Sequence, residues 1–256
     1  MEASSGTCEV ARLPEEILSA LLALTTPRDA CRAAAADSDA VWSRFMPRDL
    51  SPLTDDSELS GGSASSEKGR FLRLCDRPVL LADGLTSMWL DREGGARCYM
   101  LSARQLNIAW GDTPHYWSWI PIQGSRKMLS RNSIYAAYMV FKVAEGAYGL
   151  CSPYPETSVT LGGSQSTRQV CFEEDGDHLL PVWMVMANRG GRDGIPQNVL
   201  LPRERVDGWM ELEMGELQND EGEDGEVSIK LMETSATVMS GLIVQGIEIR
   251  PKKRDH

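Results

Sequence analysis

The sequence is poor in the residues that most catalytic and metal sites use. It has only 3 histidines among 256 residues, and no two of its 6 cysteines are spaced as CxxC. A structural zinc ion takes cysteine and histidine ligands at short, regular spacings, so we expect no metal site. No GxSxG, HExxH or glycine-rich phosphate loop is present either. We therefore expect no enzyme and no cofactor.

Basic residues and long apolar runs are also scarce. The chain has 26 lysines and arginines against 37 acidic residues, and its formal net charge is -11. Non-specific nucleic-acid binding needs many cations, so we expect no nucleic-acid partner. No apolar run is long enough to span a membrane, and the N-terminus lacks a basic segment followed by an apolar core. We expect a protein of the cytoplasm and nucleus, without a membrane partner, whose six scattered cysteines are free thiols.

Residues 10–48 are predicted to be helical. Pro14 stands near the first position of a helix, and Ile17, Leu18, Leu21 and Leu22 then form one apolar stripe. Thr26 and Pro27 suit the start of a second helix. A short third helix carries Val41, Trp42 and Phe45.

Residues 49–68 are rich in serine, glycine and aspartate and are predicted to form a flexible linker. The residues that follow continue into a helix, because Phe71, Leu72 and Cys75 share one helical face. The helical segment is too short to close a substantial core by itself. Its apolar surface must therefore dock on a partner or cover the following domain as a lid.

From about residue 87 the apolar pattern alternates with period two. Met210, Leu212 and Met214 alternate with Glu211 and Glu213, and the segments around Val227–Leu231, Tyr135–Val143 and Ile247–Ile249 repeat this pattern. Many short strands with polar turns and no long intervening helices indicate an antiparallel β-sandwich over residues 69–256. The expected fold class is mainly β.

The helical segment resembles the F-box motif. The resemblance rests on residues 13–18 (LPEEIL), 27–30 (PRDA) and 40–42 (AVW). F-box proteins use this trihelical surface to bind the Skp adaptor of a cullin–RING ubiquitin ligase. The resemblance implies a Skp-binding surface made of Leu13, Pro14, Ile17, Leu18 and Trp42.

The second domain resembles the plant phloem protein 2 lectin family, which is related to Nictaba. The similarity rests on residues 97–122, 162–171, 207–217 and 222–250. It implies a jelly-roll-like lectin sandwich preceded by a small F-box, the domain order of one branch of that family. It also implies binding of N-acetylglucosamine-containing or other N-glycans.

Four residues match positions that the family associates with sugar binding. They are Trp110, Trp117, Glu226 and Glu233. Aromatic rings stack on the C–H faces of sugars, and carboxylates accept hydrogen bonds from sugar hydroxyls. The alternative is that both tryptophans are buried core residues, as tryptophans commonly are.

Two gaps separate this sequence from the family pattern. About two helical turns of the F-box are missing between Ala36 and Asp37. About one strand and its turn, or more, is missing between Ile122 and Lys127. In addition, Val238 stands where the family commonly has a tryptophan.

Together the two resemblances predict the substrate-recognition adaptor of a Skp–cullin–F-box ligase. A glycoprotein would be its target. The alternative is a stand-alone nucleocytoplasmic lectin-like protein with a vestigial F-box, whose sandwich binds either a carbohydrate or a protein surface.

The missing strand generates a prediction about stability. Its absence exposes the backbone groups of neighbouring strands, so the sheet is expected to rearrange locally or to be poorly stable. A thermal melt of the purified chain tests the second outcome. One cooperative transition well above the growth temperature would contradict low stability.

Overall fold

A computed structural model provides the structure, and its described residues fall into two compact units, residues 1–99 and 100–256. This division does not coincide with the predicted boundaries at residues 48 and 68, which stay a prediction. The predicted linker lies almost entirely outside the described residues. The structure describes residues 14, 17, 21, 25–31, 39–47, 66–109, 118–120, 124–125, 129–130, 132–151, 153–161, 164–172, 196–219, 226–232 and 239–252.

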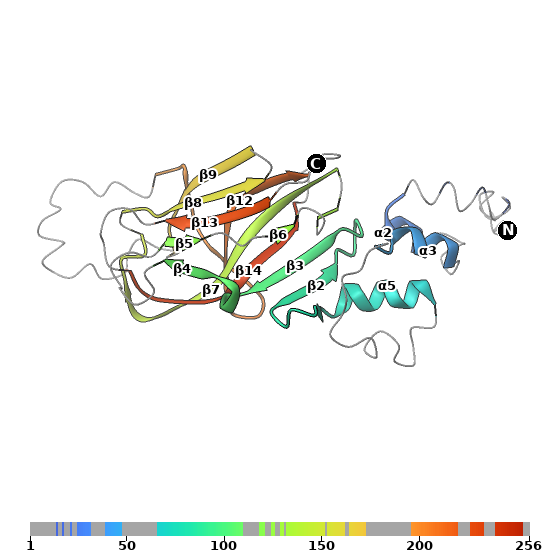
Figure 1. Cartoon of the computed structure of the whole chain (residues 1–256), viewed down its shortest axis with the longest axis horizontal. Helices are drawn as coiled ribbons and strands as arrows, with labels where there is room; N and C mark the ends of the chain where they lie inside the picture. The colour runs from blue at the N-terminus through green and yellow to red at the C-terminus, as the bar shows by residue number, and fades with distance from the viewer. Residues whose placement is uncertain are drawn as a thin grey trace, which may run out of the picture. The chain divides into compact units, whose positions relative to one another are not determined.

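The first unit combines helices with a small set of strands (Figure 1). The strands β1, β2 and β3 are consecutive neighbours in their sheet. The elements are α2 (Pro27–Ala30), α3 (Asp39–Phe45), α5 (Glu67–Asp76), β1 (Val79–Leu80), β2 (Thr86–Leu90) and β3 (Arg97–Ser102).

One helix start follows the capping chemistry that the sequence predicts, and a second shows the same chemistry. The side chain of Thr26 accepts a hydrogen bond from the backbone N–H of Asp29, with Pro27 in the first turn of α2. Ser66 caps α5 by accepting from the N–H of Gly69 at 3.1 Å. The expected helix after the linker is therefore confirmed.

Aromatic packing holds the helices of the first unit together. The ring of Trp42 lies 5.2 Å from that of Phe71 and 5.8 Å from that of Phe45, between centroids. The turn between β2 and β3 joins this core at Gly95, where an added Cβ would lie 3.2 Å from Cγ of Pro27. Asp39 Oδ1 also accepts from the N–H of Glu67 at 2.8 Å. Residues on both sides of the predicted linker thus share one core.

The second unit contains two facing sheets. In one, the strand order is β14-β7-β12-β11, and in the other it is β10-β9-β8-β13-β5-β4. The elements are η2 (Ala103–Gln105), β4 (Asn107–Ala109), β5 (Ser118–Ile120), β6 (Gly124–Ser125), β7 (Ser133–Tyr148), β8 (Glu156–Leu161), β9 (Ser164–Val170), β10 (Val199–Leu200), β11 (Arg203–Glu204), β12 (Met210–Asn219), β13 (Glu226–Met232) and β14 (Ser240–Pro251).

The mainly β, sandwich-type fold class is confirmed, with one local difference. All the strand pairs of the second unit whose register is defined are antiparallel except β10 with β9, which is parallel. The predicted inward residues Leu212, Met214 and Ile229 are buried, at 2% exposed or less. Alternation is typical of sheets with one solvated face, and it is the reason these strands could be predicted.

The strands β5 and β6 lie along the same edge of β13. Leu231 pairs with Trp119, and Val227 pairs with Gly124, so the register shifts by one residue between the two pairings. Residues 121–123 between them lie outside the described residues. This is the part of the sheet where the family pattern is interrupted.

The two sheets approach each other closely at a bulge in β12. The register with β7 shifts between Glu213 and Gly215, as a β-bulge does. A Cβ on Gly215 would lie 2.8 Å from Cγ2 of Val159 in β8. Beside it, the hydroxyl of Thr157 donates to the backbone carbonyl of Met214 at 2.7 Å. Side chains of the second sheet thus satisfy backbone groups of the first.

The bulge also explains a ring of ion pairs between the sheets. The bulge adds one residue to β12. As a result, the carboxylates of Glu213 and Glu216 both form ion pairs with Arg168 of β9 and with Lys252, which follows β14. Their N–O distances include 2.9 Å for Arg168 to Glu213 and 2.8 Å for Lys252 to Glu216. The hydrogen bond from Lys252 and the neighbouring cations lower the pKa of Glu216, against the smaller effect of burial.

A second ring of charges covers the outer face of β7. Glu248 accepts from Arg205 and Arg250, each at 2.7 Å, and Glu211 pairs with the same two arginines. The guanidinium of Arg250 also lies 3.9 Å from the ring centroid of Tyr138. Burial alone would lower the pKa of Arg250, but hydrogen bonds and charges from both acids raise it.

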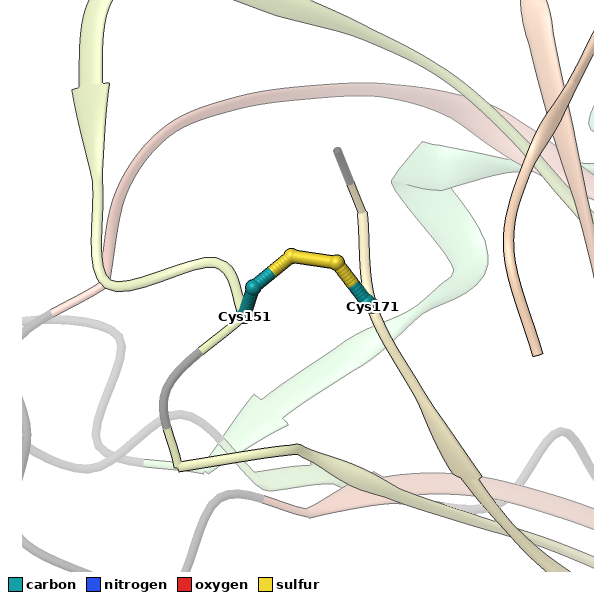
Figure 2. Close-up of a disulfide and its surroundings, with 2 residues drawn as sticks. All are labelled: Cys151 and Cys171. Atoms are coloured by element: carbon teal, nitrogen blue, oxygen red, sulfur yellow. A yellow bond between two sulfur atoms is a disulfide. The ribbon is translucent and has the colours of Figure 1, made fainter. Parts of the chain in front are cut away.

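The expectation of six free thiols is wrong for one pair. Cys151 and Cys171 form a disulfide, with their Cα atoms 4.5 Å apart (Figure 2). Their separation of 20 residues hides this proximity, which arises because β8 and β9 form a hairpin. Cys31, Cys75 and Cys98 are not in disulfides, and Cys8 lies outside the described residues.

The close approach at Gly215 predicts a sharp steric cost. Gly215→Ala puts a methyl group against Val159, and we expect it to lower the free energy of unfolding by about 1–3 kcal/mol. Urea unfolding measures the change. Ser166→Ala, which removes the neighbouring hydroxyl without adding an atom, is the matched control. Equal stability of the wild type and Gly215→Ala would contradict this account.

Candidate functional site

The second sheet brings three chain positions into one row at one of its ends. Ala109, the last residue of β4, pairs with Ser118, the first residue of β5. Ser118 in turn pairs with Met232, the last residue of β13. Neighbouring strands are about 4.8 Å apart, so the three positions lie within roughly 10 Å.

Three of the four predicted sugar-binding residues come next along the chain from this row. Trp110 follows Ala109, Trp117 precedes Ser118, and Glu233 follows Met232. All three lie outside the described residues, and their roles stay predictions. The described strands nevertheless show that segments far apart in sequence reach the same sheet end.

Glu226 belongs to the opposite end of β13. It is the first residue of that strand and pairs with Ser125. Six residue steps separate it from Met232, about 20 Å at the usual rise of a strand. The register therefore does not bring Glu226 to the row beside Trp110, Trp117 and Glu233.

The backbone of Trp119 pairs with that of Leu231, which is 2% exposed and belongs to the buried core. Successive residues of a strand point to opposite faces of the sheet. Met232, the residue of β13 that takes part in the row, accordingly occupies the outward face.

Outward-facing polar residues continue the row across β8 and β9. Met232 pairs with Glu156, and Glu156 pairs with Gln169. Both polar residues are exposed, and Gln169 Oε1 accepts from the amide of Asn198 at 3.3 Å. The sequence patterns did not single out these residues, since only the strand register reveals them.

A different surface lies in the first unit. Ile17 and Leu21 have helical backbone and are 49% and 46% exposed. The sequence predicts that both belong to one apolar stripe, and together they form an exposed apolar pair. Pro14 is also exposed, and its carbonyl accepts from the N–H of Ile17 at 3.0 Å. Leu21 was not among the predicted contact residues, although it belongs to the same apolar stripe.

Trp42 occupies another environment. Its relative exposure is 0%, and its ring packs on Phe71 and Phe45. The side chain therefore supports the helices from inside the first unit. A direct contact between Trp42 and Skp stays a prediction, as do the contacts of Leu13 and Leu18, which lie outside the described residues.

The described residues show few other features of a catalytic, metal or membrane site. No group of three or more potential metal ligands occurs among those residues. Burial raises the pKa of the Cys75 thiol to about 12, which keeps it protonated at neutral pH. None of the described helices is long and apolar enough to cross a membrane.

Known proteins are similar in sequence to this chain over most of its length. The profile of the Phloem protein 2 family matches residues 96–128 and 121–251. The Arabidopsis thaliana protein named F-box protein PP2-B10 is 37% identical over 273 residues, which cover 94% of this chain and 93% of the relative. The chain belongs to the plant F-box proteins of the phloem protein 2 family.

Two further Arabidopsis thaliana relatives of this family are similar over most of their length. F-box protein PP2-B1 is 34% identical and F-box protein VBF is 32% identical. Each alignment covers 94% of this chain, with 89% and 99% of the respective relative. The match therefore includes the F-box end as well as the phloem protein 2 domain.

The comparisons also support the predicted deletion in the phloem protein 2 domain. The alignment with PP2-B10 spans 273 residues, more than the 256 of this chain, so it contains gaps. The family profile matches in two separate segments, which overlap over residues 121–128. That interval contains the position between Ile122 and Lys127 where the sequence predicts a missing strand.

The contrast between Trp42 and Ile17 in this F-box predicts different effects on stability. Trp42→Ala opens a cavity in the first unit and is expected to cost about 3–5 kcal/mol. Ile17→Ala removes an exposed side chain and is expected to change stability by less than about 0.5 kcal/mol. Urea unfolding followed by circular dichroism compares them. Equal losses for both variants would refute the assigned burial.

Proposed function

We propose that this protein is a non-catalytic adaptor of a Skp–cullin–F-box ubiquitin ligase. Its helices recruit the Skp adaptor, and its phloem protein 2 domain captures a glycoprotein. The membership of the family supports this assignment, and so does the exposed apolar pair of Ile17 and Leu21. Exposed apolar residues on one helix face are a common form of protein-docking surface.

The convergence of three strands at one sheet end carries the glycan half of the proposal. The row of Ala109, Ser118 and Met232 supports it, because Trp110, Trp117 and Glu233 are the next residues along the chain from these three. The tryptophans would stack on sugar rings, and Glu233 would accept hydrogen bonds from hydroxyls. We expect N-acetylglucosamine-containing or other N-glycans to be the ligands.

A pull-down with purified Skp tests the docking half. Ile17→Asp places a charge on the exposed pair without opening the core, and we expect it to weaken Skp binding at least tenfold. Leu80→Asp is the matched control, because Leu80 is also exposed (43%) but lies on β1. A wild-type chain that fails to bind Skp would support the stand-alone lectin with a vestigial F-box.

A glycan array followed by titration tests the sugar half. We expect Trp117→Ala to abolish binding and Glu233→Gln to weaken it. Glu226→Gln is the discriminating variant, because Glu226 lies at the other end of β13 and should change affinity less than twofold. An equal loss for both glutamate variants would refute the single-row site. No glycan binding by the wild type, with target binding retained, would favour recognition of a protein surface.

A further inference from the structure

The disulfide joins two segments at one end of the second sheet. Cys151 lies in the turn between β7 and β8, and Cys171 directly follows β9. The bond therefore closes the open end of the β8–β9 hairpin (Figure 2).

Backbone hydrogen bonds hold the two cysteine segments together independently of the sulfur–sulfur bond. The N–H of Val170 donates to the carbonyl of Pro155 at 2.9 Å, and that of Phe172 donates to Leu150 at 3.3 Å. The ring of Phe172 also packs edge-on against Phe141, 5.1 Å between centroids. These contacts would keep the two thiols adjacent after reduction, which favours reversible closure.

The two cysteine residues differ in their exposure to solvent. Cys171 is 0% exposed, whereas Cys151 is partly exposed. A dissolved thiol or peroxide therefore reaches Cys151 first. This asymmetry gives the pair an attacking residue and a resolving residue.

The disulfide also lies beside the row described above. Glu156 follows Cys151 by five residues, and Gln169 precedes Cys171 by two. Both belong to the row that runs through Ser118 and Met232. A bond that fixes the ends of β8 and β9 therefore fixes the outward residues next to the proposed glycan site.

We propose that Cys151 and Cys171 form a reversible redox staple that raises the affinity of the neighbouring glycan site, an inference that rests on the proposed function for its ligand. Hydrogen peroxide is the oxidant. The Cys151 thiolate attacks one peroxide oxygen, the O–O bond breaks, and a sulfenic acid and hydroxide form. Cys171 then attacks the Cys151 sulfur, its proton neutralises the leaving hydroxide, and water departs as the disulfide forms.

Reduction follows the opposite electron flow. A glutathione thiolate attacks the Cys151 sulfur, and Cys171 leaves as a thiolate that takes up a proton. A second glutathione then releases Cys151 and forms glutathione disulfide. Two electrons pass from two glutathione molecules to the protein, so the exchange is balanced.

The staple is tested on the full chain in glutathione buffers of graded ratio. Acid quenching, alkylation and mass spectrometry measure whether Cys151 and Cys171 are protected. We expect loss of protection in reducing buffer, its return with hydrogen peroxide, and a melting temperature about 5–10 °C lower in the reduced form. Cys151→Ser should melt at one temperature in both buffers, while Cys31→Ser should respond like the wild type.

Two outcomes would overturn the staple. One is alkylation of both residues at every glutathione ratio, and the other is a disulfide that reducing buffer never opens in the folded chain. Titration with the best array glycan tests the regulatory role, and we expect at least threefold weaker binding by the reduced chain and by Cys151→Ser. Equal affinity in both redox states would overturn that role alone. A wild type that binds no glycan in either state refutes the proposed function together with this regulation, while alkylation still decides the staple.

Discussion

The second unit depends on the close approach of the β12 backbone at Gly215 to the side chain of Val159 in β8. Only a residue without Cβ lets β12 lie this near Val159, and this approach lets Thr157 reach the carbonyl of Met214. The bulge at the same place directs Glu213 and Glu216 towards Arg168 and Lys252. One local irregularity therefore supplies the packing, a buried hydrogen bond and a charge ring between the two sheets.

The two charge rings differ in what they contribute. The ring around Glu216 is partly solvated, so its net contribution to stability is small and depends on salt. Glu248 is only 4% exposed and is satisfied by two arginines. Removing one partner there would leave an uncompensated buried charge, which is far more costly than the pair is favourable. That ring therefore specifies how β11, β12 and β14 are arranged more than it stabilises them.

The sequence predicts those parts of the fold that follow a local pattern. Leu212, Met214 and Ile229 alternate with polar neighbours, and Thr26 with Pro27 marks the start of a helix, so these elements could be found. The two-residue strands β10 and β11 carry no periodic signal. The burial of Trp42 depends on Phe71 across the predicted linker, and the pairing of Cys151 with Cys171 depends on a hairpin register. The row at the sheet end likewise needed the strand order, although the family resemblance had named the residues beside it.

The core that residues on both sides of the predicted linker share determines which changes between α3 and α5 the fold can tolerate. Asp39 holds the start of α5, and Trp42 packs on Phe71, so α3 and α5 are held together by their own contacts. Lengthening the connection between two such anchor points costs only a slowly growing closure entropy. Insertions, tags or a protease cut placed between these anchor points would leave the helices assembled. The segment is a permissive position for labelling the F-box end without detaching it.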